Sequence, residues 1–326
     1  MERFLPLIAL LAGLASWMLL FGVPAFAPPA LASTAVVVAA EPANDSISSF
    51  DEPLAVVLRV IDPGPDAPYQ VGRFLMADEE PVETDAEAMV LLTRAGEVIR
   101  LEPGEVATLR PQDEETADPL FRLLRALLRD GPSSAVDPAA HVADPTDPFL
   151  RPNSDELRPI RPTGDRMVRS LMPRMEWEGR EEVATYRLYL WAADGTLVTM
   201  DAGSHASWTL PPEAALSPGA RYEWAVEPLP GDRIGPRATF IVAPREILDE
   251  VAQELGGLRR RGLDPEGDGR LAAAAVFRSM GFAYDALDTL TDLQAAGDPL
   301  GPEVTEFHRR LVDELASSET QGSPDN

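Results

Sequence analysis

The chain has 326 residues, enough for two or three domains of ordinary size, and its 45% hydrophobic content is that of a foldable globular protein. Its 54 Asp and Glu residues outnumber 28 basic residues, all of them Arg, and the formal charge of −26 makes nucleic acid and anionic membrane surfaces poor partners. The absence of cysteine excludes disulfides, zinc ribbons, thiol catalysis and iron–sulfur ligation.

The first 32 residues have the three parts of a secretory signal peptide. Arg3 supplies a positive charge, residues 4–23 are apolar and uncharged, and small-residue cleavage sites follow at 25–27 and 30–32. A stretch of about 20 apolar residues could instead span a bilayer as an uncleaved anchor. The prolines beside the cleavage sites favour a signal peptide, and both interpretations place the remaining chain outside the cytoplasm, in the periplasm or the extracellular space.

Residues 33–49 are expected to form a disordered leader, and residues 50–130 a small β module. In the module, short apolar runs alternate with turns that contain Gly or Pro. From Asp118 on, leucines at helical spacing predict a helix that covers the sheet, with Asp118 as its cap. The expected apolar face of this helix consists of Leu120, Leu123, Leu124, Leu127 and Leu128.

Residues 88–111 of this module read AMVLLTRAGEVIRLEPGEVATLRP, in which a strand pair carries a Gly-x-x-x-x-Leu-x-Pro-Gly run. This stretch resembles the tail of a FecR-like domain, the periplasmic module of signal regulators. The resemblance implies a sensor or regulator that acts with a membrane signalling protein. The cytoplasmic anti-sigma segment of that family has no counterpart in this sequence.

A proline-rich linker, or an extended strand-like connector, is expected over residues 131–170, where no periodicity is sustained. Residues 171–244 then alternate between apolar and polar side chains in seven short strands that are separated by turns. This pattern is typical of a Greek-key β-sandwich, with one face of each sheet turned to a shared core.

The same stretch resembles a fibronectin type III domain. The resemblance rests on Trp177, on the Tyr186-x-Leu188-x-Leu190 strand and on the run from Leu216 to Val226, which reads LSPGARYEWAV. It implies that Trp177 packs in the core of a sandwich and that Tyr222 hydrogen-bonds to the backbone upstream of it. The loop over residues 201–206 has no Arg-Gly-Asp run, so cell adhesion is not implied.

Tyr189 and Trp191 have the opposite strand parity to Tyr186, Leu188 and Leu190. We therefore expect these two rings to form an exposed aromatic pair, and they are the candidate contact surface of the protein. Core packing is the favoured explanation for the inward-facing aromatic residues of the stretch, in preference to stacking on carbohydrate.

Residues 245–316 are expected to form a helical unit, because amphipathic segments follow one another there, over 245–261, 270–280, 282–295 and 301–316. Residues 270–293, with Gly281 at the turn, resemble a single tetratricopeptide-like hairpin. Arrays of that type need about three repeats to be stable, so one hairpin predicts a helical cap or a dimerisation arm. Residues 317–326 are expected to form a disordered tail.

The run from Asp264 to Leu271 imitates the start of an EF-hand loop, with acidic residues at positions 1, 3 and 5 and Gly at position 6. Position 12, which requires a bidentate Glu, is Ala275, so we expect a helix-connecting turn capped by Asp268 rather than a metal site. The histidines lack paired zinc spacing and no Gly-x-Ser-x-Gly run is present, so the sequence predicts no metal, no cofactor and no catalytic residue. The histidines are His141, His205 and His308.

The predicted fold class is multidomain and mainly β with C-terminal α: a small N-terminal β module, an Ig/fibronectin-III-like β-sandwich and C-terminal helical hairpins. The predicted function is that of a non-catalytic exported protein that binds or scaffolds an envelope protein through protein–protein contacts. No small-molecule substrate and no nucleic acid are expected, and membrane contact is expected only through an uncleaved amino terminus. The alternatives are a FecR-like periplasmic sensor and a hydrolase with a site assembled from distant carboxylates.

Overall fold

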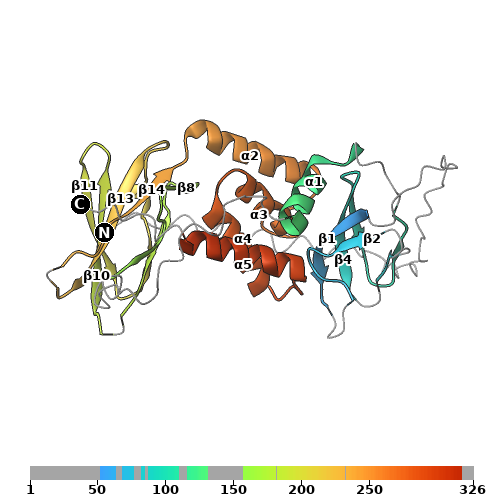
Figure 1. The fold of residues 1–326 in the computed structure, drawn as a ribbon, viewed down its shortest axis with the longest axis horizontal. Coiled ribbons are helices and arrows are strands. Elements are labelled where there is room, and N and C mark those ends of the chain that lie inside the picture. Colours follow the sequence, from blue (N-terminus) through green and yellow to red (C-terminus); the bar gives the residue numbers. More distant parts are fainter. Residues whose placement is uncertain are drawn as a thin grey trace, which may run out of the picture. The chain divides into compact units, whose positions relative to one another are not determined.

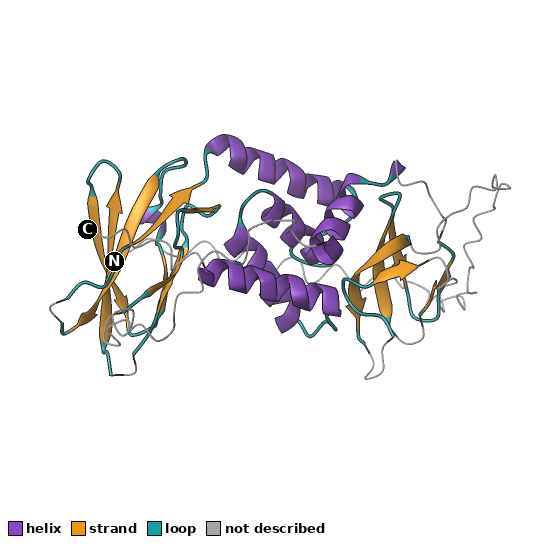
Figure 2. Cartoon of the chain, in the orientation of Figure 1, coloured by secondary structure: helices purple, strands orange, loops and turns teal. Residues whose placement is uncertain are grey.

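The computed structural model describes residues 52–63, 68–76, 82–84, 87–109, 116–130, 157–180, 182–231 and 233–317. The predicted signal peptide or anchor, the leader and residues 318–326 of the tail lie outside the described residues. Figure 2 shows several sheets, and most of the helices follow them in the sequence. This agrees with the predicted β-rich fold with C-terminal helices. In this part of the chain, no helix has the length and apolar character that crossing a membrane requires.

The amino-terminal sheet is built around one apolar strand, β1. The strand order is β2-β1-β4-β5, and β3 and β6 pair in a separate two-stranded sheet. The strands are β1 (Pro53–Ile61), β2 (Phe74–Met76), β3 (Val82–Glu83), β4 (Ala88–Thr93), β5 (Val98–Leu101) and β6 (Val106–Ala107). Most side chains of β1 are buried on both faces, which explains why its sequence is a continuous apolar run rather than an alternating one.

A helix with the predicted cap packs on this sheet. The helical segments are α1 (Pro119–Arg125) and a π-helical turn over Ala126–Asp130. The Asp118 carboxylate accepts hydrogen bonds from the backbone N–H groups of Leu120 (2.8 Å) and Phe121 (3.4 Å). The Phe121 ring lies edge-on to Phe74 of β2, with 6.0 Å between the ring centroids, so α1 contacts the sheet as expected.

The buried face of α1 and of the π-helical turn agrees in part with the predicted one. Leu120, Leu124 and Leu128 are buried as predicted, but Phe121 is buried too, and Leu123 and Leu127 are only half-buried. Both faces satisfy a spacing of about 3.6 residues per turn, so periodicity alone does not choose between them. Phe121 lies on the buried side of α1 because its ring packs against Phe74 of β2.

Two further sheets are formed by the middle of the sequence, coloured green to yellow in Figure 1. The larger has the strand order β11-β10-β13-β14-β8 and the smaller β12-β9-β7, and all pairs are antiparallel except β14 with β8. The larger sheet contains β8 (Arg166–Val168), β10 (Thr185–Ala192), β11 (Leu197–Gly203), β13 (Arg221–Leu229) and β14 (Ala238–Val242). The smaller contains β7 (Pro159–Arg161), β9 (Arg174–Trp177) and β12 (Ser207–Thr209).

Strands β7 and β8 lie in residues that the sequence assigned to the linker. β7 pairs with β9 and β8 pairs with β14, so this end of the predicted segment belongs to the sheets, which fits a strand-like connector and not a plain linker. Each of the two strands has only three residues, which is too few to carry an alternating pattern. The remainder of the predicted linker, up to residue 156, lies outside the described residues.

Inward-facing aromatic rings join the two middle sheets. Trp177 of β9 and Tyr186 of β10 are buried and meet edge-on, with 5.3 Å between their centroids. Tyr222 is also buried, and its hydroxyl oxygen accepts a 2.9 Å hydrogen bond from the backbone N–H of Ser217, upstream in the sequence. The inward orientation predicted for Trp177 and Tyr222 is therefore confirmed, as is the backbone hydrogen bond expected at Tyr222.

Four helices follow the sheets, close to the predicted bounds. They are α2 (Arg245–Arg260), α3 (Arg270–Ser279), α4 (Ala283–Ala295) and α5 (Pro302–Ser317). Gly281 lies in the turn between α3 and α4 and has a φ of +86°, a conformation that glycine adopts without strain. The apolar side of α5 includes Val304 and Phe307, but Val312, which fits the same spacing, is 42% exposed.

The amino-terminal sheet and the C-terminal helices, far apart in the sequence, are in contact. Val71 forms a parallel bridge with Leu300, its N–H donates to Pro299 O (2.8 Å), and its carbonyl accepts from Gly301 N (2.8 Å). Other contacts join α3 to α1 and to β1, and α5 to the π-helical turn. The helices therefore cover the first module, which the sequence treated as separate from them.

Candidate binding surface on the five-stranded sheet

Tyr189 and Trp191 lie on the face of β10 opposite to the core. The side chains between and beside them, Tyr186, Leu188 and Leu190, are at most 2% exposed, so the parity predicted from the sequence is correct. The two rings are nearly parallel, with an interplanar angle of 14° and 5.8 Å between their centroids. Each is half-buried rather than fully exposed, because neighbouring side chains cover part of it.

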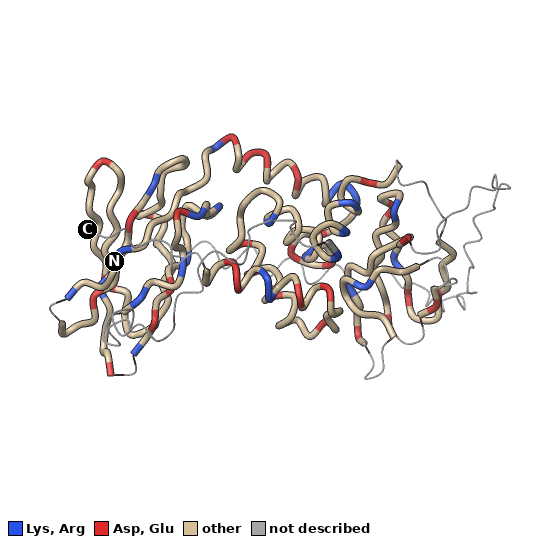
Figure 3. The backbone as a smooth tube through the Cα atoms, in the orientation of Figure 1, with Lys and Arg blue, Asp and Glu red and all other residues tan. Residues whose placement is uncertain are grey.

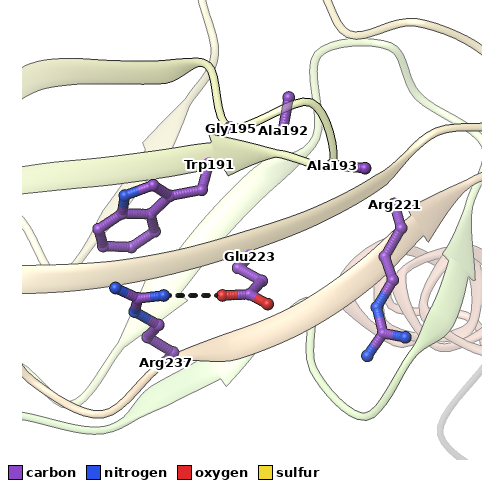
Figure 4. A pocket seen from close by; sticks show the side chains of 7 residues that line it. All are labelled: Trp191, Ala192, Ala193, Gly195, Arg221, Glu223 and Arg237. Atoms are coloured by element: carbon purple, nitrogen blue, oxygen red, sulfur yellow. Dashed lines mark hydrogen bonds and ion pairs between the residues drawn. The ribbon is translucent and has the colours of Figure 1, made fainter.

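Arg237, immediately before β14, covers Trp191 (Figure 4). Its guanidinium carbon lies 4.1 Å from the centroid of the Trp191 ring, a cation–π geometry. The same guanidinium is ion-paired with Glu223 of β13 at 3.0 Å, and Glu223 is directly opposite Trp191 in the sheet register. Two strands of the sheet, and the residue that precedes a third, thus contribute to the position of one indole ring.

Tyr189 is held by a second carboxylate. Its hydroxyl donates a 2.6 Å hydrogen bond to Glu227 Oε2, and Glu227 is only 9% exposed. This hydrogen bond, together with burial and the charge of Glu227, raises the pKa of the Tyr189 phenol, so the donor form is maintained at neutral pH. We define the outer aromatic surface as Tyr189, Trp191, Glu223, Glu227 and Arg237.

An open depression of about 490 Å³ lies beside Trp191 (Figure 4). It is lined by Trp191, Ala192, Ala193, Gly195, Arg221, Glu223 and Arg237. Both arginines are engaged within the chain, Arg237 with Glu223 and Arg221 with Asp165 at 3.0 Å. Because a guanidinium already lies over the Trp191 ring, that face of the indole is not available for stacking on a sugar.

Three members of the surface, Arg237, Glu223 and Glu227, were not singled out from the sequence. Glu223 and Glu227 share the outward parity of their strand, a signal that was present in the alternation of β13. Arg237 lies 46 positions after Trp191 and outside any strand, so only the pairing of β13 with β14 brings it to the indole.

A second polar cluster joins the smaller sheet to α4. Arg161 donates from Nε and Nη2 to the two carboxylate oxygens of Glu176 (2.6 and 2.8 Å) and also bonds Asp288. Burial alone would lower the pKa of Arg161 and raise that of Glu176, but their mutual hydrogen bonds reverse both shifts, so both groups remain charged. These bonds connect β7 with β9 and α4. The pKa of Glu176 is lowered, so its carboxylate is not suited to act as a general acid at neutral pH.

In the EF-hand-like turn, the Asp268 carboxylate is engaged by other groups of the chain. The Asp268 carboxylate accepts a hydrogen bond from Asp264 N (2.8 Å) and is ion-paired with Arg100 of β5. The residue that caps α3 is Gly269, so the prediction of Asp268 as its N-cap is wrong; its side chain faces back into the turn. Within the described ranges, no group of three or more His, Asp or Glu side chains could hold a metal ion.

The histidines are not brought together among the described residues. His308 Nε2 lies 3.4 Å from the Thr291 hydroxyl on the helices, His205 lies in the β11–β12 connection, and His141 lies outside the described residues.

No protein-family model matches the chain, and no curated protein sequence matches it. The fold and the surface define a β-rich protein with C-terminal helices and an ordered aromatic surface on one sheet.

Proposed function

We propose that the chain is a non-catalytic, exported binding protein of the cell envelope, and that it contacts a protein partner through the outer aromatic surface. The observation that carries this proposal is the stack of Tyr189 and Trp191 with Arg237 over the indole. Aromatic residues and Arg are enriched at the energetic centres of protein interfaces. Glu223 and Glu227 hold these side chains in place, which lowers the entropy lost when a partner binds.

A fibronectin type III-like sandwich in residues 171–244, extended at its start by β7 and β8, is part of the same proposal. The chain crosses repeatedly between the sheets β12-β9-β7 and β11-β10-β13-β14, as Greek-key sandwiches do. The contact of Trp177 with Tyr186 and the hydrogen bond at Tyr222 support it further. A fold of this class does not by itself imply a function, so the binding role rests on the outer aromatic surface.

Export rests on the amino-terminal pattern of charge, apolar stretch and small-residue sites over residues 1–32. A net charge of −26 without lysine further favours a basic protein partner over an anionic surface. The partner would therefore be an envelope protein with a basic contact region.

Affinity purification from an envelope extract tests the proposal. The baits are the wild-type mature chain, a Tyr189→Ala/Trp191→Ala variant, and a Val106→Ala variant as the control, because Val106 is a 45% exposed apolar residue on another sheet. The proposal predicts one protein that is recovered by the wild-type and control baits and depleted at least tenfold with the double variant. Equal recovery by all three baits, or recovery of no specific protein, would contradict it.

A FecR-like sensor is the second candidate. β4 and β5 form the expected hairpin, and Gly104 follows them in a turn with a φ of +79°. A sensor that acts with a membrane signalling protein would retain its apolar amino terminus, whereas a released binding protein would lose it. Amino-terminal sequencing of the mature protein distinguishes these outcomes.

A further inference from the structure

Strand β11 is one edge of the five-stranded sheet. It has seven residues, Leu197–Gly203, and it pairs with β10 on one side. Among the described residues, no strand pairs with its other side, and no backbone group of Leu197–Gly203 bonds to a segment outside the sheet. The outer side of β11 therefore presents backbone donors and acceptors that can receive another strand.

This edge has few of the features that protect most sheet edges from pairing, and its one register irregularity lies at its end, between the Asp201 and Gly203 pairs. β11 contains no proline and no basic residue, and Asp201 is its one charged side chain. Leu197 and Val198 are 48% and 37% exposed, on opposite faces of the strand. The opposite edge of the sheet, β8, contacts α4, and its Arg166 is ion-paired with Glu314 of α5 at 2.9 Å. The fold covers one edge and leaves the other open.

The register of β11 connects the open edge to the outer aromatic surface. Leu197 is directly opposite Trp191 and Thr199 is opposite Tyr189, both on the outer face. Asp201, on the same face, is opposite Arg187 and accepts a 2.9 Å hydrogen bond from its Nε, while the Asp201 side chain stays 65% exposed. A strand added to β11 would therefore place its outward side chains next to this row. Such a strand would lie beside Leu197 at one end and beside the Asp201 carboxylate at the other.

We propose that β11 binds an extended, basic segment of a protein partner as a sixth strand of this sheet. This inference rests on the proposed function and specifies the partner chemistry. Main-chain hydrogen bonds to β11 supply binding, an apolar side chain packs on Leu197, and an Arg or Lys of the segment pairs with Asp201. The chain as a whole favours such a segment, because its acidic residues outnumber its basic ones and are distributed over its elements (Figure 3).

A second copy of the chain fits this edge less well. If two β11 strands paired antiparallel about Thr199, each Asp201 would face the partner's Leu197, a carboxylate against an apolar side chain. The two copies would also each bring a charge of −26. A basic segment avoids both problems.

Peptide binding tests the inference directly. The probes are a nine-residue peptide of alternating Val and Thr with Arg at both ends, the same peptide with Glu in place of Arg, and the Arg peptide N-methylated at alternate backbone positions. Titration calorimetry is expected to show binding of the Arg peptide and at least tenfold weaker binding of the other two. No binding of the Arg peptide, or equal binding of all three, would overturn the proposal.

Variants separate this inference from the proposed function. Val198→Lys places a like charge on the edge and is expected to weaken the Arg peptide at least tenfold, whereas Val106→Lys, at a comparably exposed position on β6, is expected to leave it unchanged. If Trp191→Ala abolishes capture of the envelope partner while Val198→Lys does not, the proposed function stands and the added strand is wrong. Sedimentation that shows a wild-type dimer broken by Val198→Lys would assign the edge to a second copy and also overturn the proposal.

Discussion

The guanidinium carbon of Arg237 lies 4.1 Å from the centroid of the Trp191 ring, and the same group pairs with Glu223 at 3.0 Å. This relationship joins β10, β13 and the residue that precedes β14 at the outer face of the sheet. Tyr189 and Trp191, which the sequence identified only as outward-facing, are therefore part of an ordered surface.

The energetic link between Arg237 and Trp191 can be measured with a double-mutant cycle. Arg237→Ala and Trp191→Ala are expected to be coupled by about 0.5–1 kcal/mol in the free energy of unfolding, the range of an exposed cation–π contact. Urea denaturation of the wild type, the two single variants and the double variant gives the coupling. Strictly additive effects would show that the contact does not stabilise the sheet.

The hydrogen bond at Tyr222 is expected to stabilise the fold. Tyr222→Phe leaves the Ser217 N–H without its acceptor, and an unsatisfied group of this kind costs about 1–3 kcal/mol of unfolding free energy. Tyr189→Phe serves as the comparison. It also removes a tyrosine hydroxyl, but one on the outer face that donates to the Glu227 carboxylate instead of accepting from a backbone N–H. A loss at Tyr222 below about 0.5 kcal/mol in urea denaturation would contradict the expected role of this corner.

Arg161 is expected to control part of the acid stability of the protein. In the folded state Arg161 holds the pKa of Glu176 below its ordinary value although burial opposes this, so the pair contributes stability that is present above the unfolded pKa and is lost as the pH falls through the folded one. Arg161→Met leaves Glu176 and Asp288 without this partner and is expected to cost about 2–3 kcal/mol at neutral pH.

The acid dependence of this variant provides the stricter test. Without Arg161, Glu176 keeps the more exposed Arg174 at 2.7 Å, and its pKa is expected to rise because burial is then opposed less strongly. Protonation of Glu176 therefore costs the variant less stability than it costs the wild type. The gap in unfolding free energy between wild type and Arg161→Met should therefore narrow as the pH falls below about 5, the region of carboxyl titration. Denaturation curves at a series of pH values check this, and a gap that is constant with pH would contradict the assignment.

The contact between the first sheet and α5 is tested at Gly72. Gly72 and Gly104 both have positive φ, +86° and +79°, so replacement by Ala strains the backbone at both positions. A Cβ at Gly72 would lie 2.1 Å from Val304 Cγ2 of α5, whereas nothing lies within 4 Å of one at Gly104. Gly72→Ala is therefore expected to lower the thermal midpoint more than Gly104→Ala. Equal losses would show that the sheet and helix do not pack as described.

The sequence predicted features that depend on local periodicity. The alternation of β10 placed Tyr189 and Trp191 on the outer face, and the apolar spacing of the last helices gave their bounds to within a few residues. Trp177 and Tyr222 were predicted to face inward for the same reason, since parity along a strand is a local property.

Features that depend on long-range contacts were not predictable. The bridge of Val71 to Leu300 joins residues from two predicted domains, and neither carries a signal for the other. Arg237 reaches Trp191 only because β14 pairs with β13. In both cases the deciding partner is distant in the sequence. Asp268 was expected to cap α3, but the helix begins one residue later, after Gly269, and the Asp268 carboxylate accepts a hydrogen bond from Asp264 N–H within the turn.

The dissociation constant of the proposed envelope partner, measured with purified proteins, tests the central claim most directly. Trp191→Ala is expected to raise it at least tenfold, about 1.4 kcal/mol of binding free energy, while Val106→Ala leaves it within a factor of two of the wild type. If Trp191→Ala binds as tightly as the wild type, the outer face of the five-stranded sheet is not the binding surface, and the account given for this protein is wrong.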